Sequence, residues 1–555
     1  MSLNQAGFKL TTREYFFMLL FFGTILIVPL IGNKIIPGHD YVFHVTRILD
    51  VASGLREGIF PVRIYVDEIH FWGIPLGIFY PGLFIYVPAL LSLLGVPIEI
   101  CYNIFTASIF YMGLIASWKG FSILTRSRIA GFFSAILYIS SGWFLIDAYI
   151  RNALGELIAL AFLPLAIACI MDLIVKPKVL TNRYILGIIS ISAIIESHVL
   201  TSAFLVAYSL FFIAFHYKYV SLLVIKRLFI FLVIIFSLNA TFIIPFLFYY
   251  IKVPVMLSYI DYFTKESLPI VVLLHLFITS NIWLLISLYF FFSIYYHRHK
   301  KLLFFSKTNL YSGKLLLFIQ YCLWGLLFAF LSSNLMPWDS LPSLKRIFQI
   351  MQFPWRFLGI TTLFFCICGG CGLRLLFRKF KIGTRSIVLL TSIICLTNLV
   401  VLTYAEPFPF EKIKQKISWE RFISDTDDDY LYKDMNVKAL FSQGNRYFSN
   451  AEIFNMKKNL TSVSFSYFAR STSTITLPLV NYPGYIASDQ DGNELVIREN
   501  ENHMVVIPLT KGIGEVHVQF VGLPIFRIAD YISIIALLLL IYLYTTKYNR
   551  IHSVN

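Results

Sequence analysis

The sequence predicts a polytopic α-helical membrane protein of about 12 transmembrane helices, with a small extracytoplasmic β-rich domain near its C-terminus. Three observations predict this fold class. The 555 residues are 58% hydrophobic and 14% charged, with a mean hydropathy of +0.74, which is too apolar for a soluble globular protein. Apolar runs of roughly 20 residues, the length that crosses a bilayer, recur along the chain. Between residues 406 and 523 the composition becomes polar and apolar residues alternate.

The net charge of +16 predicts the direction of these helices, because Lys and Arg concentrate in the cytoplasmic loops of membrane proteins. It is therefore no sign of nucleic-acid binding. With twelve spans, six clusters of basic residues all fall on one side, so both termini are expected in the cytoplasm. These clusters are Arg126 with Arg128, Lys176 with Lys178, Lys218 with Lys226 and Arg227, His297–Lys301, Arg378 with Lys379 and Lys381, and Lys547 with Arg550. No small-residue cleavage pattern follows the first span, which predicts a retained helix and not a signal peptide. The predicted spans are 15–32, 99–122, 129–147, 155–175, 183–197, 199–216, 227–248, 270–296, 314–333, 356–376, 385–405 and 527–546.

One apolar segment, Tyr80 to Leu94, is left out of this count. Counting it would place Arg126 and Arg128 outside, against the charge rule. We therefore interpret the segment as an interfacial or re-entrant helix on the outer face. Residues 33–97 then form one large first outer loop, partly embedded in the membrane, and residues 334–355 form another outer loop.

Strand signals fill the polar region 406–523. Alternating runs such as Thr474–Val480 and turn signals such as Pro483-Gly484 are typical of a small β-sandwich. We expect this domain outside the membrane, between a transmembrane module over residues 1–405 and a last helix with a cytoplasmic tail over 524–555. The acidic run 425–429 lacks the glycine and the closing glutamate of a calcium loop, which favours a solvated turn.

The 7 cysteines all fall in or beside apolar segments, so a disulfide framework is not expected. The motif Cys366-x-Cys368-x-x-Cys371 lies in a hydrophobic helix without a neighbouring His or Asp, which favours buried thiols over a metal site. No ligand set predicts a particular cofactor, and dependence on a divalent cation stays open.

Ionisable residues gather at the predicted outer face, where they are costly near hydrocarbon unless they pair or take part in chemistry. In helical geometry Asp40, His44 and Arg47 stand at i, i+4 and i+7 and share one face. The alternative is a juxtamembrane helix whose charges reach water. A carboxylate beside cations could deprotonate an acceptor hydroxyl while the cations hold a phosphate leaving group. The other ionisable residues of this face are Asp67, Glu68, His70, Arg151, Glu156, Glu196, His198, Lys345, Arg346 and Arg356.

Several of these residues have a structural interpretation as well. Arg151 and Glu156 are equally consistent with a simple ion pair at the start of a helix. Trp338 and Trp355 are consistent with an interfacial aromatic belt. His198 lies between two short apolar helices and needs a polar partner there, which favours a functional role.

Short motifs follow one another in order along most of the chain. They are Asp40-x-x-x-His44-x-x-Arg47, Gly58-Ile59-Phe60-Pro61-Val62-Arg63, Phe79-Tyr80-Pro81, Tyr149-x-Arg151 with Gly155-Glu156, Ser197-His198, Gln352-Phe353-Pro354-Trp355-Arg356-Phe357-Leu358 and Tyr482-Pro483-Gly484-Tyr485. Together they resemble the GT-C superfamily of bacterial membrane glycosyltransferases, close to the YfhO-like and the 6-pyruvoyl-tetrahydropterin-synthase-related membrane proteins. Gly82 departs from the Tyr-Pro-Pro-Leu pattern of the outer loop in that family.

The resemblance implies a glycosyltransferase of the bacterial plasma membrane that uses a polyprenyl-phosphate-sugar donor on the outer side. It implies a role in cell-wall polysaccharide or glycolipid biosynthesis. The acceptor hydroxyl would attack the anomeric carbon and the lipid phosphate would leave. Carried onto this chain, with the residues of the outer face, it predicts Asp40, His44 and Glu68 as catalytic residues; Arg151, Lys345, Arg346 and Arg356 as ligands of the donor phosphate; and Arg47, Glu156, His198, Gln352 and Trp355 as substrate-positioning residues.

Two other classes of protein fit the same pattern. A lipid-linked glycan transporter or flippase also combines many spans with buried cations, although internal repeats and helices broken at the midplane are typical of transporters. A non-catalytic assembly factor for cell-envelope polysaccharide would rely on the β-rich domain and would not need Asp40. The sequence leaves open the sugar, the acceptor and the oligomeric state.

Overall fold

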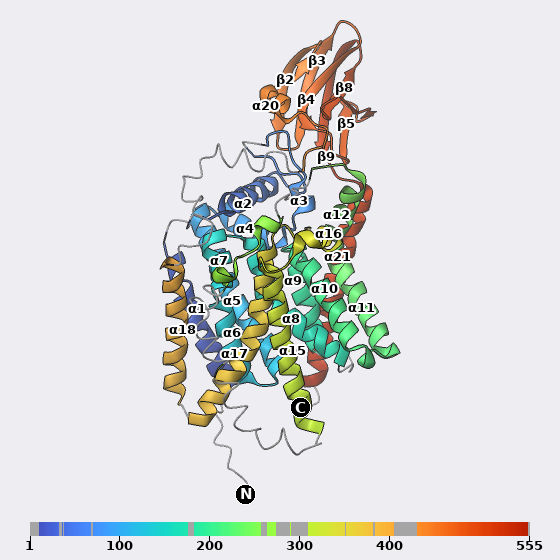
Figure 1. Ribbon diagram of the computed structural model, residues 1–555. Helices are drawn as coiled ribbons and strands as arrows, with labels where there is room; N and C mark the ends of the chain where they lie inside the picture. Colours follow the sequence, from blue (N-terminus) through green and yellow to red (C-terminus); the bar gives the residue numbers. More distant parts are fainter. Residues whose placement is uncertain are drawn as a thin grey trace. The chain divides into compact units, whose positions relative to one another are not determined.

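The computed structural model of the protein describes residues 10–32, 36, 38–67, 70–175, 182–256, 263–273, 289, 309–349, 351–380, 383–404 and 430–552 (Figure 1). The chain divides into two compact units. Unit 1 comprises Met1–His44, Val96–Phe231 and Tyr259–Lys414, and unit 2 comprises Val45–Gly95, Leu232–Ser258 and Gln415–Asn555. The helix α2 (Tyr41–Arg56) passes from unit 1 into unit 2.

Unit 1 is helical, as the sequence predicts. Its central helix is α8, which is apolar on all sides and almost wholly buried against α5, α9 and α10. Helix α5 approaches α8 closely at Gly120, where an added Cβ would lie 2.6 Å from the Pro164 carbonyl oxygen. The helices of this unit are α1 (Thr12–Leu26), η1 (Val28–Leu30), α5 (Ile98–Thr125), α6 (Arg128–Ile139), α7 (Gly142–Ile146), η3 (Asp147–Arg151), α8 (Leu154–Val175), α9 (Asn182–Ile195), α10 (Val199–Phe215), η4 (Tyr217–Tyr219), η5 (Phe263–Glu266), α15 (Asn309–Ser332), η6 (Trp338–Ser340), α16 (Pro342–Gln349), η7 (Pro354–Phe357), α17 (Leu358–Phe380) and α18 (Thr384–Tyr404).

Among the described residues, four helical segments are long and apolar enough to cross a membrane, or six if each of two bent helix pairs is one span. The four are Ile98–Thr125, Leu154–Val175, Pro354–Phe380 and Pro524–Thr545. The predicted span 129–147 is bent by 42° between α6 and α7. The predicted span 227–248 is not one straight helix, because the chain bends by 82° between α11 (Leu222–Leu238) and α12 (Ala240–Lys252).

In the described part of the chain, the remaining predicted spans do not meet this criterion of length and apolarity. The helices Asn182–Ile195 and Val199–Phe215 have 14 and 17 residues, and α1, over the predicted first span, has 15. Within α15 and α18, the apolar stretches Ile319–Ser332 and Thr384–Val400 are shorter than 18 residues. The predicted span 270–296 lies almost wholly outside the described residues. The count of twelve spans therefore stays a prediction. The excluded segment 80–94 forms η2 (Leu83–Ile85) and α4 (Tyr86–Leu93), which together reach about half a bilayer.

Unit 2 contains two antiparallel sheets between residues 448 and 520, which confirms the predicted C-terminal β-rich region (Figure 1). Their orders are β1-β4-β8-β7 and β2-β3-β9-β5-β6. Buried residues alternate along β9, as expected for sheets with one covered face. The strands are β1 (Phe448–Ser449), β2 (Glu452–Asn459), β3 (Ser462–Ala469), β4 (Ser473–Val480), β5 (Tyr485–Asp489), β6 (Glu494–Leu495), β7 (Arg498–Glu499), β8 (Met504–Leu509) and β9 (Gly512–Phe520).

Segments far apart in the sequence are joined within unit 2. Trp72, from the predicted first outer loop, is fully buried, and its carbonyl oxygen accepts a hydrogen bond from the Val480 amide at 3.1 Å. Its ring meets the Phe441 ring edge-on at 4.9 Å. The hydroxyl of Tyr249 in α12 donates to the Pro483 carbonyl at 2.7 Å. The unit also contains α3 (Leu76–Phe79), α20 (Val437–Gln443) and α21 (Pro524–His552).

Candidate functional site

A π-helical turn after α7 positions the first ionisable groups. This turn, η3, spans Asp147–Arg151 and ends at Asn152, which adopts a left-handed conformation with φ 55°. The amide of Ala153 then donates to the Asp147 carbonyl at 3.0 Å, and α8 begins at the next residue. Single π-helical turns inside helices are often found at functional sites. The turn brings Arg151 back to Asp147 and places Glu156 in the first turn of α8, where the helix dipole favours a carboxylate.

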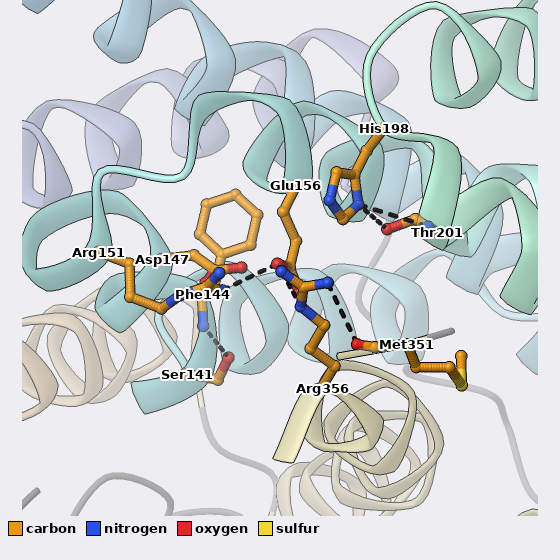
Figure 2. A network of polar contacts seen from close by, with 9 residues as sticks. All are labelled: Ser141, Phe144, Asp147, Arg151, Glu156, His198, Thr201, Met351 and Arg356. Atoms are coloured by element: carbon orange, nitrogen blue, oxygen red, sulfur yellow. Dashed lines mark hydrogen bonds and ion pairs between the residues drawn. The ribbon is translucent and has the colours of Figure 1, made fainter. Parts of the chain in front are cut away.

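These residues form a buried ion cluster, which we define as Asp147, Arg151, Glu156 and Arg356 (Figure 2). The Arg151 guanidinium donates to the carboxylate of Asp147 and, at 2.8 Å, to Oε2 of Glu156. Nε of Arg356 lies 3.6 Å from the same Oε2, and its Nη1 donates to the Met351 carbonyl at 3.2 Å. None of the four is more than 9% exposed. Glu156 is therefore shared between two guanidinium groups that come from distant parts of the sequence.

Aromatic rings cover the two guanidinium groups of the cluster. The guanidinium carbon of Arg151 lies 4.7 Å from the Trp355 ring centroid, and that of Arg356 lies 5.4 Å from the Phe353 ring centroid. Trp355 also packs against Trp143, with 5.5 Å between ring centroids. Cation–π contacts of this kind stabilise cations that are desolvated by burial. Trp355 is only 6% exposed, so in this structure it is a wall of the cluster.

Asp40 is held beside the cluster by its backbone. Its amide donates to the Arg151 carbonyl at 2.8 Å, and the amide of His39 donates to the Ile150 carbonyl at 3.2 Å. Gly38 permits this approach, because an added Cβ would lie 2.6 Å from both the side-chain Nδ2 of Asn152 and the Ile150 carbonyl oxygen. Asp40 itself is half-buried.

The electrostatic surroundings of Asp40 suit a proton acceptor. Burial raises the pKa of the Asp40 carboxyl, and Arg151 and Arg356 oppose the shift. The net effect is an upward shift. A carboxylate with a raised pKa is a stronger base than an ordinary aspartate and stays close to two cations.

His198 and Glu196 lie in the connection between α9 and α10. Nδ1 of His198 is 2.8 Å from the Thr201 hydroxyl and accepts from the Thr201 amide, so His198 caps α10. This contact supplies the polar partner that the sequence requires for His198. Burial lowers the pKa of His198 to about 3 and raises the pKa of Glu196 to about 8. Near neutral pH, His198 is therefore uncharged and Glu196 is largely protonated.

The other predicted site residues lie in different surroundings. His44, in α2 of unit 1, is 1% exposed. Arg47 follows it on the same helix but belongs to unit 2, where it donates to the Pro81 carbonyl at 2.8 Å and lies over the Tyr80 ring at 4.1 Å. Glu68 lies outside the described residues.

The loop before α17 supplies two further cations and a strained residue. Lys345 on α16 is paired with Asp339 at 2.7 Å, and Arg346 is exposed. Gln352 adopts a left-handed conformation with φ 65°, two residues before η7 begins. The structure therefore brings Arg151, Glu156 and Arg356 into one cluster, and it does not place Lys345 or Arg346 in that cluster.

Asp147 is the residue of the cluster that the sequence interpretation missed. It stands four residues before Arg151, a spacing that brings opposite charges together on a helix. That spacing was the available signal. Among the described residues, no group of three or more His, Cys, Asp or Glu side chains could hold a metal ion.

Comparisons with known proteins give a structural likeness. No family model matches the sequence, and no curated protein matches it. The crystal structure of ArnT from Cupriavidus metallidurans bound to undecaprenyl phosphate aligns with a TM-score of 0.38 and 10% sequence identity, over 71% of this chain and 72% of that chain. A structural likeness this weak supports no conclusion about fold or function, so both are argued from the residues of this chain.

Proposed function

We propose that the protein is a membrane glycosyltransferase of the GT-C type that moves a sugar from a polyprenyl-phosphate donor to a cell-envelope glycan or glycolipid. The observation that carries the proposal is the half-buried Asp40 carboxylate, anchored by its backbone to Arg151 beside a cluster with two arginines. Undecaprenyl phosphate, the ligand of the ArnT structure, is a lipid of the class proposed here.

The proposed reaction needs a base and a site for an anionic leaving group. The acceptor hydroxyl oxygen attacks the anomeric carbon, and its proton passes to the Asp40 carboxylate. The bond between the anomeric carbon and the phosphate oxygen breaks, and the lipid phosphate leaves with the electron pair. Cations stabilise the charge that develops on that oxygen. Every atom and proton is accounted for without a further reactant.

Arg356 and Arg151 are the proposed cations nearest the base. Two carboxylates already balance these two guanidinium groups, so a phosphate needs further positive charge. Lys345 and Arg346, on α16, are the proposed source, because guanidinium and ammonium groups bind phosphate oxygens well. In this arrangement Glu156 and Trp355 position Arg151 and Arg356, whereas His44, His198 and Gln352 remain proposed contacts of the sugar or of the base.

The experiment is transfer of labelled sugar from a polyprenyl-phosphate-sugar pool to the cell envelope. Wild type is compared with Asp40→Asn at matched membrane abundance, since this substitution keeps the size and removes the base. We expect a loss of roughly a hundredfold or more, the scale of general-base catalysis. Asp50→Asn is the matched control, because Asp50 is a buried aspartate of α2 outside the proposed site. Unchanged transfer by Asp40→Asn would reject Asp40 as the base.

The two rival classes predict different outcomes of the same assay. A flippase would move the lipid-linked sugar across vesicle membranes without forming a new glycosidic bond. An assembly factor would retain its function in Asp40→Asn and lose it when residues of the two sheets are changed. Absence of wild-type-dependent transfer with any donor would reject the glycosyltransferase.

A further inference from the structure

A cavity of about 930 Å³ opens in unit 1, away from the buried ion cluster. Its wall includes Met171, Asp172 and Val175 from the last turns of α8, whereas Glu156 of the cluster lies in the first turn of that helix. At 1.5 Å per residue, Glu156 and Asp172 are separated by roughly 24 Å along α8. The cavity and the ion cluster are therefore separate sites at opposite ends of one helix.

Cations surround one part of this cavity. Arg126, Arg128 and Arg183 line it, and Asp172 is the one carboxylate among its lining residues. Asp172 forms an ion pair with Arg183, with 2.9 Å between Oδ1 of Asp172 and Nη1 of Arg183. Among the described residues, no ion pair involves Arg126 or Arg128. The cavity thus keeps an excess of positive charge, which favours an anionic ligand.

A buried hydroxyl in the same wall lacks a protein partner. Tyr321 is 5% exposed, and its hydroxyl has no hydrogen-bond partner among the described residues. The hydroxyl lies within electrostatic range of Arg126. Buried polar groups normally have a partner, because leaving one unsatisfied is costly. A ligand oxygen in the cavity would satisfy it.

Apolar side chains form much of the remaining wall and continue onto the surface. Met171, Val175 and Ile319 line the cavity together with Phe215 and Leu323, which are 62% and 60% exposed. An apolar wall next to arginines suits an amphiphile with an anionic head and a hydrocarbon chain. A soluble phosphate compound would leave these apolar side chains uncovered.

We propose that this cavity binds an anionic phospholipid, with its phosphate at Arg126, Arg128 and the Tyr321 hydroxyl. Its acyl chain lies along the apolar wall. In the predicted topology Arg126 and Arg128 face the cytoplasm, so this lipid comes from the inner leaflet. The site is independent of the proposed transfer reaction and does not require it.

The test measures lipid retained by the full-length protein in detergent, by native mass spectrometry. The probes are dioleoylphosphatidylglycerol and dioleoylphosphatidylcholine, with glycerol 3-phosphate and inorganic phosphate as soluble competitors. The first variant is Arg126→Gly with Arg128→Gln. Glycine suits position 126, whose φ is 51°, so the backbone is kept while the charge is removed. Arg385→Gln, at an exposed arginine of α18 outside the cavity, is the matched control.

We expect wild type and Arg385→Gln to retain phosphatidylglycerol in preference to phosphatidylcholine. Retention of phosphatidylglycerol should fall roughly fivefold for each arginine removed. Tyr321→Phe should weaken retention about threefold without lowering thermal stability, because its hydroxyl has no protein partner to lose.

Three results would overturn the proposal. They are equal retention by the double variant and wild type, no preference for phosphatidylglycerol, and displacement of the lipid by millimolar glycerol 3-phosphate or inorganic phosphate. The last would mean that the cavity recognises a soluble phosphate and not a lipid. None of these results bears on sugar transfer by Asp40, so the two proposals fail separately.

Discussion

The buried ion cluster of unit 1 and the Arg63–Asp530 pair of unit 2 show two ways of burying charge. In unit 2, Nη2 of Arg63 donates to Oδ1 of Asp530 at 2.6 Å, and the Thr241 hydroxyl donates to the same oxygen at 2.6 Å. One cation, one anion and one hydroxyl are enough to join three distant segments. Unit 1 instead buries two cations and two anions, with Asp40 beside them.

The difference separates a structural link from a candidate site. Desolvation of each ion costs several kcal/mol, so a link gains nothing from extra charges. A single ion pair would be enough to join α8 to η7, and the ion cluster of unit 1 contains two cations and two anions. It also adjoins a half-buried carboxylate, whereas the Arg63–Asp530 pair accepts a hydrogen bond from the Thr241 hydroxyl. This surplus favours chemistry in unit 1 and a purely structural role in unit 2.

The largest effect on stability is expected from Glu156→Gln. The variant leaves two buried guanidinium groups with only the Asp147 carboxylate, and such uncompensated burial costs about 3–5 kcal/mol. Chemical unfolding in detergent measures the loss. Asp172→Asn is the control, because it removes a carboxylate from an exposed ion pair on the same helix. Equal losses in the two variants would contradict the cluster geometry.

Breaking the unit 2 pair is expected to cost about 3 kcal/mol, and removing both charges should recover most of that loss. The variants are Asp530→Leu and Arg63→Met with Asp530→Leu. The single change leaves the buried Arg63 guanidinium without a carboxylate partner. The double change removes both charges and leaves only the Thr241 hydroxyl without its acceptor. Unfolding measurements give the stabilities, and labelled-sugar transfer gives the activity.

Unfolding and sugar transfer, measured on matched double variants of the two units, test whether the ion cluster of unit 1 has a role beyond structure. We expect the unit 2 double variant to keep transfer. The corresponding neutral pair in the cluster, Arg151→Met with Glu156→Leu, should lose transfer even where it folds. Full transfer by that cluster variant would make the cluster a structural link, like the one in unit 2.

A smaller effect is expected from pH, through Glu196. Burial raises the pKa of Glu196 from 4.5 to about 8, so the folded state binds the proton more tightly than the unfolded chain. The stabilisation is complete below pH 4.5 and is lost as the pH rises toward 8. Between pH 6.5 and 8 the contribution of Glu196 to the unfolding free energy should fall by about 1.5 kcal/mol.

The neighbouring histidines oppose this change in the lower part of the window. Burial lowers the pKa of His198 to about 3 and that of His39 to about 4, so both are uncharged in the folded state, whereas in the unfolded chain they are about half protonated at pH 6.5 and lose that proton as the pH rises. The effect of Glu196 is therefore read from the difference between wild type and Glu196→Gln, which should lack the fall in unfolding free energy that Glu196 causes. A profile that stays as steep as that of wild type would assign the pH dependence to another group.

The smallest effect is expected from Asp172→Asn. The Arg183 side chain of this pair is 48% exposed, and exposed ion pairs contribute less than about 1 kcal/mol. Unfolding in detergent at two salt concentrations measures it, since salt should weaken the pair further. A loss of 3 kcal/mol or more would mean that the end of α8 near the cavity is as closed as the ion cluster.

Local sequence spacing predicted part of the candidate site. Arg151 and Glu156 were recognised as a pair because they flank the start of one helix, and the turn at Glu196-Ser197-His198 followed from two apolar runs without a loop between them. Asp147 could have been found by the same reasoning. The participation of Arg356 could not, because no local spacing relates it to Glu156, 200 residues earlier.

By itself, the sequence determined the apolar helical class of the protein and the position of its β-rich region, because hydropathy and residue alternation are local properties. The tertiary structure decided which charges meet. It joined Arg356 to Glu156, paired Arg63 with Asp530, and assigned Arg47 to a different unit from Asp40. It also bent the helix predicted over 227–248. These outcomes depend on packing between distant segments, and a chain's local pattern does not encode the partners that such packing selects.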